Sequence, residues 1–261
     1  MAEIPSLPQR AFVVSAQRRD ELASAFQSDA ESYDKIRPSY PDEALDFTLQ
    51  NHPAEAVDIG CGSGIFTEQL VGRGLDVTAV DPSEAMLSVL ANRLPEVAML
   101  CAHGEATGLA GNSFDLVTYA QAWHWVDHPK ASAEAARLLR DHGWLTLLWN
   151  QLDVSIPWVH RLARIMHAGD VHRPELEPPL GPEFRKPEHG IWHWSMPLDF
   201  PEIVELTKSR SYYRKATATT QAKVEANLRW YWTEHLGHEP SARVQVPYLT
   251  HAWRSRRRPR R

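Results

Sequence analysis

The residues with the clearest chemical potential lie between positions 56 and 81. A short apolar run over residues 56–59 ends in a glycine-dense turn over residues 60–64, and a helical pattern follows. These features predict a strand, a tight loop and a helix, because glycine lets the backbone bend sharply and lets a ligand approach closely. The next apolar run ends at Asp81, 21 residues after Gly60. A carboxylate at this place in a strand–helix–strand unit can accept hydrogen bonds from two ribose hydroxyls, so the loop indicates a nucleoside site.

Two classes of nucleoside ligand compete for this loop. A dinucleotide loop reads G-x-G-x-x-G and holds a pyrophosphate at the helix N-terminus. Here the spacing is G-x-G-x-G, and Ile65 takes the sixth position. Asp58, two residues before the first glycine, would repel a phosphate but could hold an ammonium group. S-adenosylmethionine (SAM) has an amino-acid end, a sulfonium and a ribose but no phosphate, so the loop favours SAM. A turn in which the glycines serve only packing is the structural alternative.

Several motifs resemble those of class I SAM-dependent methyltransferases, in particular the small-molecule "type 11" branch. The resemblance spans roughly residues 25–255, and its motifs are the segments 30–41, 58–64, 80–87, 113–115, 120–125 and 209–212. It implies that SAM is the cofactor and that a small molecule accepts the methyl group. The cofactor-binding residues that it implies are Tyr33, Arg37, Asp58, Gly60, Cys61, Gly62, Gly64, Asp81, Pro82, Met86, His103, Gly104, Glu105 and Gln121.

The segment after the longest predicted strand supplies the candidates for catalysis and substrate binding. His124 is the candidate general base, because a neutral imidazole can accept a proton near pH 7. The alternative, that His124 only packs between two neighbouring indoles, stays open. The candidate substrate-binding residues are Trp123, Trp125, Trp149 and Trp158. For each of these tryptophans, packing in the core is the competing interpretation.

Composition and charge narrow the function classes. The chain has 261 residues, 43% of them hydrophobic, and a net charge of −5, although six arginines lie in the last eight residues. The acidic remainder argues against a large phosphate-binding face, so a nucleic-acid partner is not expected. No apolar run is long enough to cross a membrane.

No secretory signal is evident and the two cysteines make no disulfide framework, so we expect a cytoplasmic protein without a membrane partner. No histidine, cysteine or carboxylate cluster has the spacing of a metal site.

Strands alternate with helices up to about residue 150, which predicts an α/β protein with a sheet wound on both faces. With the resemblance, the expected fold is a doubly wound, mostly parallel seven-stranded sheet of the Rossmann-like methyltransferase type, with an antiparallel last strand and a helical, proline-rich cap. Pro247 would restrict the last strand to an edge or a bulge. The expected parts are an N-terminal arm and covering helix (1–40), a SAM-binding core (41–150), a cap or substrate-side insertion with strand six (151–200), closing helices and the last strand (201–254), and a basic disordered tail (255–261).

Two functions from other classes remain open at this point. One is a nucleotide-dependent oxidoreductase, although the third glycine of a dinucleotide loop is missing. The other is a SAM-binding protein of the same fold that does not methylate. The sequence leaves open the substrate, the acceptor atom (O, N, C or S) and the oligomeric state.

Overall fold

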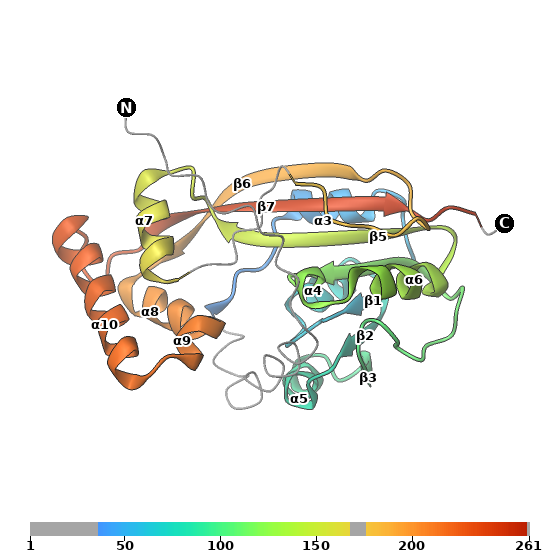
Figure 1. The fold of residues 1–261 in the computed structure, drawn as a ribbon, viewed down its shortest axis with the longest axis horizontal. Coiled ribbons are helices and arrows are strands. Elements are labelled where there is room, and N and C mark those ends of the chain that lie inside the picture. Colours follow the sequence, from blue (N-terminus) through green and yellow to red (C-terminus); the bar gives the residue numbers. More distant parts are fainter. Residues whose placement is uncertain (1–35, 168–175, 260–261) are drawn as a thin grey trace.

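A computed structural model describes residues 36–167 and 176–259 (Figure 1). Most of the predicted N-terminal arm and covering helix lies outside the described residues, and so does the predicted site residue Tyr33. No helix of the described segments is both long and apolar enough to span a membrane.

The described part of the chain forms one seven-stranded sheet in the order β3-β2-β1-β4-β5-β7-β6. The strands are β1 (Glu55–Ile59), β2 (Asp76–Asp81), β3 (Ala98–Cys101), β4 (Phe114–Ala120), β5 (Leu139–Leu152), β6 (Glu188–Leu198) and β7 (Val244–Arg256). The first five strands pair in parallel, and β7 runs antiparallel to both β5 and β6. The predicted fold, a mostly parallel seven-stranded sheet with an antiparallel last strand, is confirmed.

Most of the helices fall into two groups along this sheet. They are α3 (Asp42–Leu49), α4 (Ile65–Gly72), α5 (Glu84–Arg93), α6 (His128–Leu138), α7 (Pro157–Ile165), α8 (Phe200–Lys208), α9 (Ser211–Lys215) and α10 (Ala218–Arg229), with the 3-10 helix η1 (Trp123–Trp125) and the π-helix η2 (Trp230–His235). In Figure 1, α7 to α10 gather at one end of the molecule, and α4 to α6 lie toward the other. We call α7 to α10 the cap, which covers one end of the long strands. Of these helices, α7 falls within the predicted cap (151–200), and α8 to α10 correspond to the predicted closing helices (201–254).

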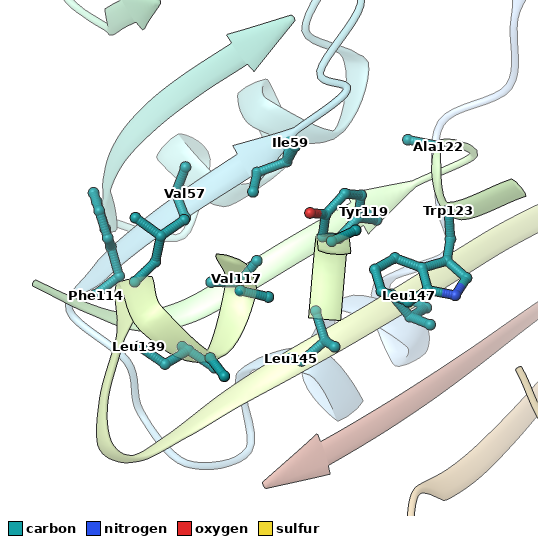
Figure 2. Packing of buried hydrophobic residues seen from close by; sticks show 14 of the residues in the cluster. Val57, Ile59, Phe114, Val117, Tyr119, Ala122, Trp123, Leu139, Leu145 and Leu147 are labelled. Atoms are coloured by element: carbon teal, nitrogen blue, oxygen red, sulfur yellow. The ribbon is translucent and has the colours of Figure 1, made fainter. Parts of the chain in front are cut away.

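Alternating side chains divide the core between the two faces of the sheet. On β1, Val57 and Ile59 belong to the hydrophobic cluster that α6 covers, whereas Ala56 belongs to the cluster under α3 and α4. Figure 2 shows the first of these clusters, in which side chains from β1, β4 and β5 lie together. This arrangement follows from the period of two along a strand, which sends successive side chains to opposite faces.

The cap has a core of its own, which continues the sheet. Val159 of α7, Ile203 of α8, and Leu228 of α10 are fully buried, and all belong to one cluster with Val246 and Tyr248 of β7. The ends of the long strands therefore pass into the cap, where they bring residues of the last third of the chain to the same edge as the glycine loop.

The expectation that Pro247 restricts the last strand to an edge or a bulge is wrong, since β7 lies between β5 and β6 and pairs with both in continuous register. The pairing between β5 and β7 extends only to Leu152 opposite Tyr248. Pro247 lies one residue outside this ladder, where its carbonyl oxygen accepts a hydrogen bond from the Asp153 N–H at 3.0 Å. The missing N–H of proline therefore removes no hydrogen bond from the β5–β7 ladder.

The expectation of a disordered tail from residue 255 is wrong for residues 255–259. Ser255 and Arg256 belong to β7, and Arg257 is only 3% exposed. The Arg257 guanidinium donates to the Leu139 carbonyl at 2.7 Å and pairs with Asp141 at 3.1 Å. A buried guanidinium needs such partners, and the start of β5 supplies them. Residues 260 and 261 lie outside the described residues.

Candidate functional site

A cavity of about 500 Å³ opens along the edge of the sheet where β1, β2, β4 and β5 end and where β7 passes. This edge is where open α/β sheets bind ligands. The sequence-predicted site residues that line it are Arg37, Gly60, Cys61, Gly62, Asp81, Pro82, Met86, His103, Gly104, Glu105, Gln121 and Trp125. Residues predicted from separate motifs thus converge on one cavity.

The glycine loop lines this cavity through residues 60–63. Gly60 has φ +72°, and a Cβ atom there would lie 2.4 Å from the Cβ of Ala122, so no larger residue fits. Gly62 also has a positive φ, of +56°, but a Cβ there would meet no atom within 4 Å. No side chain therefore covers the Gly62 backbone, which lines the cavity, so a ligand can approach it closely. Gly64 precedes α4 as its N-cap residue and does not line the cavity.

Asp81 holds the loop and faces the cavity. One carboxylate oxygen accepts the Gly62 N–H and the other accepts the Ser83 N–H, each at 2.9 Å. Burial raises the pKa of Asp81, while these two backbone hydrogen bonds act in the opposite direction. Each carboxylate oxygen can accept more than one hydrogen bond, so the group can bind hydroxyls of a ligand as well.

Asp58 is fully buried and does not line the cavity. Its two carboxyl oxygens accept hydrogen bonds from Thr67 at 2.7 Å and from Thr118 at 2.8 Å. Burial raises the pKa of Asp58 to about 6, although both threonine hydroxyls lower it. These two hydrogen bonds therefore link β1, which carries Asp58, to α4 through Thr67 and to β4 through Thr118. The predicted contact with an ammonium group stays a prediction.

The segment after β3 is fixed by partners on neighbouring elements. Glu105 accepts a hydrogen bond from the Asp127 N–H at 2.8 Å, and the buried Tyr119 hydroxyl donates to the Gly104 carbonyl at 3.1 Å. His103, Gly104 and Glu105 thereby line the cavity beside Asp81. Polar groups at this place can contact the base of a nucleoside whose ribose lies at Asp81.

Gln121 adopts an unusual backbone conformation directly after β4. Its φ is +57°, in the left-handed region that non-glycine residues rarely occupy. Its backbone N–H donates to the Leu148 carbonyl at 2.8 Å, and its side-chain amide donates to the Asn150 carbonyl. Such strain persists only where surrounding contacts fix it, and it often marks a functional site.

The predicted base and three of the four predicted substrate tryptophans lie away from the cavity wall. The Trp149 indole N–H donates to Nδ1 of His124 at 3.3 Å, and neither residue lines the cavity. Trp123 is 1% exposed and packs edge-on against Tyr119 at 4.8 Å between ring centroids, within the core seen in Figure 2. Trp158 packs against the core of the cap. These positions favour packing, and the role of His124 as a base stays a prediction.

Sequence reasoning missed several cavity residues from distant parts of the chain. They include Tyr119, Lys130, Asn150, Arg210 and Tyr248. Arg210 lies inside the 209–212 motif, which signalled the family but no role for this side chain. For Tyr248 no local signal existed, because only the insertion of β7 beside β5 brings it to the cavity. Within the described residues, no group of three or more histidine, cysteine or carboxylate side chains could hold a metal ion.

Known proteins with similar sequences and structures decide the family. The sequence model of the Methyltransf_11 family, a methyltransferase domain, matches residues 57–147. An uncharacterized methyltransferase of Mycobacterium tuberculosis is 37% identical over 238 residues, which cover 91% of this chain and 97% of the relative. The chain belongs to the class I SAM-dependent methyltransferases.

Further similarities are consistent with this family. An uncharacterized methyltransferase-like protein of Schizosaccharomyces pombe is 28% identical over 247 residues, covering 90% of this methyltransferase and 96% of the relative. The solved structure of a "putative type II methyltransferase" from Anaeromyxobacter dehalogenans is 26% identical and has a TM-score of 0.59. The match covers 86% of the present chain and 99% of the chain in the solved structure. SAM is therefore the expected cofactor of this methyltransferase.

Proposed function

We propose that the protein transfers a methyl group from SAM to a small-molecule acceptor. The observation that carries this proposal is the extent of the cavity, which runs from Asp81 at the end of β2 to Tyr248 on β7. Its volume of about 500 Å³ lies within the usual range of roughly 300–1,000 Å³ for small-ligand sites. The part near Asp81 suits a nucleoside, and the part beneath the cap leaves room for a second molecule.

The residues near the glycine loop fit SAM. Asp81 can accept hydrogen bonds from the ribose hydroxyls, and the open space beside Gly62 lets the cofactor approach the backbone. Pro82 and Met86 provide apolar surface for the adenine, and the segment after β3 provides polar contacts for its edge. We assign these residues to cofactor binding.

When bound, SAM supplies a methyl group on a positively charged sulfur, already activated for in-line displacement by a nucleophile. The protein therefore mainly has to align the acceptor with the methyl group and exclude water. Alignment and desolvation lower the activation barrier of methyl transfer even without an acid or base from the protein. Apolar side chains of the cavity wall such as Phe66, Leu152 and Leu206 can exclude water from the reacting atoms. Gln121, held by Asn150, can orient the methionine end through its fixed amide.

Calorimetric titration of the protein with SAM, S-adenosylhomocysteine and NADH tests the proposal. We expect SAM and S-adenosylhomocysteine to bind and to raise the melting temperature, because a ligand that prefers the native state stabilises it. NADH, the control ligand, should neither bind tightly nor displace them. Absence of binding by both SAM and S-adenosylhomocysteine would refute the proposal. Binding without S-adenosylhomocysteine formation for any acceptor would favour the non-methylating alternative.

A further inference from the structure

Two arginines and one tyrosine line the end of the cavity that lies beneath the cap. These residues are Arg37, Arg210 and Tyr248. Tyr248 is on β7, and the sheet order β2-β1-β4-β5-β7 places β7 four strand spacings from β2, which ends at Asp81. At about 4.8 Å per spacing, roughly 19 Å separates these two strands. The arginine end of the cavity is therefore distinct from the end that suits a ribose.

Arg37 lies beside the segment that carries Arg210, and Tyr248 lines the same cavity. The Arg37 guanidinium donates to the Ser209 carbonyl at 3.0 Å, which places Arg37 beside the residue that precedes Arg210. Tyr248 is 2% exposed, and its hydroxyl has no hydrogen-bond partner within the described residues. Burial raises the pKa of Tyr248, and the positive charges of Arg210 and Arg37 act in the opposite direction. All three side chains line one cavity, so a single ligand group can contact both guanidinium groups and the phenol.

The carboxylates of the cavity wall gather at the opposite end. Among the described lining residues, the acidic side chains are those of Asp81, Glu105 and Asp127. Asp81 and Glu105 belong to the segments that end β2 and follow β3, and Asp127 caps α6, where it pairs with Lys130 at 3.6 Å. Among the described lining residues, the carboxylates thus lie toward the ribose end and the two arginines toward the cap, so the cap end suits an anion.

We propose that Arg210, Arg37 and Tyr248 bind a carboxylate group of the methyl acceptor, so that the substrate is a small carboxylic acid; this proposal assigns Arg37 to the acceptor, although the family resemblance implies a contact with the cofactor. This inference rests on the proposed methyltransferase function. A guanidinium presents a planar pair of donors that matches a carboxylate, and such charge-assisted bonds are stronger than neutral ones. The carboxylate would also give the buried Tyr248 hydroxyl an acceptor, which the described residues do not provide.

The first test compares acids with their uncharged analogues. The protein, saturated with S-adenosylhomocysteine, is titrated with a panel of short aliphatic and aromatic carboxylic acids and with the matching carboxamides. We expect acids from this panel to bind about 10- to 100-fold more tightly than their carboxamides, as expected for hydrogen bonds to a charged group. Equal binding of acids and carboxamides, or binding of no acid at all, would overturn the inference. Failure to bind S-adenosylhomocysteine would instead refute the proposed function.

The second test removes donors one at a time. Arg210→Gln and Tyr248→Phe should each weaken binding of the preferred acid, the arginine variant by about 10- to 100-fold, with little change in affinity for S-adenosylhomocysteine. Arg243→Gln is the matched control, because Arg243 pairs with Glu202 at 2.6 Å and does not line the cavity. An equal loss of S-adenosylhomocysteine affinity in Arg210→Gln would mean that Arg210 binds the carboxylate of the cofactor, which would overturn the inference. Unchanged binding of the acid in both variants would overturn it too.

Discussion

The buried carboxyl of Asp58 leads to a specific prediction about stability and pH. Burial raises its pKa in the folded protein from the usual 3.8 to about 6. A shift of about two pKa units corresponds to about 3 kcal/mol, at roughly 1.4 kcal/mol per unit. Because the folded pKa is the higher one, the folded state binds the proton more tightly than the unfolded chain. Ionisation of Asp58 therefore costs stability as the pH rises through this window, and the full cost applies above about pH 6.

Asp58→Asn removes this titration while keeping the shape of the side chain. The amide oxygen can accept from one threonine hydroxyl, and the amide nitrogen can donate to the other. We expect the free energy of unfolding of the variant, relative to wild type, to increase by about 2 kcal/mol between about pH 4 and pH 7. This is less than the full 3 kcal/mol because part of the titration lies below pH 4. Urea denaturation of both proteins across this pH range measures the difference in their free energies of unfolding, in which the contributions of the other titrating groups cancel.

Asp115→Asn provides a control of opposite sign. Hydrogen bonds from Arg140 and from two backbone N–H groups outweigh burial and lower the pKa of Asp115. Its stabilising contribution is therefore present at neutral pH and lost as the pH falls, so the variant should become relatively less stable as the pH rises. A flat difference between Asp58→Asn and wild type would refute the reasoning about burial. A large loss of SAM affinity in Asp58→Asn would instead support the predicted ammonium contact.

Three further substitutions test the site. Asp81→Ala should weaken SAM binding by about 2–4 kcal/mol in calorimetry, because it removes charge-assisted bonds to two hydroxyls; unchanged affinity would exclude Asp81 from the ribose site. Gly60→Ala should destabilise the fold by about 2–4 kcal/mol in urea denaturation, since a Cβ would lie 2.4 Å from that of Ala122 and the φ is positive. His124→Ala should lower the free energy of unfolding by about 1–3 kcal/mol because it removes the hydrogen bond from the Trp149 N–H to the imidazole, with turnover per folded molecule unchanged. A hundredfold loss of turnover in a stable His124→Ala protein would establish a catalytic role.

The sequence by itself determined the glycine loop, the strand that ends at Asp81 and the alternation of strands with helices. These features are local, since steric limits on glycine φ values and the spacing of apolar residues act over a few neighbouring positions. The carboxylate of Asp81 could be placed at the loop because the strand–helix–strand unit that joins them is contiguous in the chain. The half of the cavity around the glycine loop was therefore predictable.

Only the tertiary structure decided which residues line the other half of the cavity, beneath the cap. Trp123 and Trp125 are two residues apart, yet the first is in the core and the second lines the cavity, which residue type alone cannot distinguish. The arginines near the C-terminus predicted a disordered tail. In the structure, Arg257 instead donates to the Leu139 carbonyl and the Asp141 carboxylate at the start of β5, at least 116 positions earlier in the chain. Tyr248 reaches the cavity because β7 enters the sheet between β5 and β6. Strand order depends on which faces can be buried together across the whole chain, so no local pattern encodes which side chains meet at the end of the cavity beneath the cap.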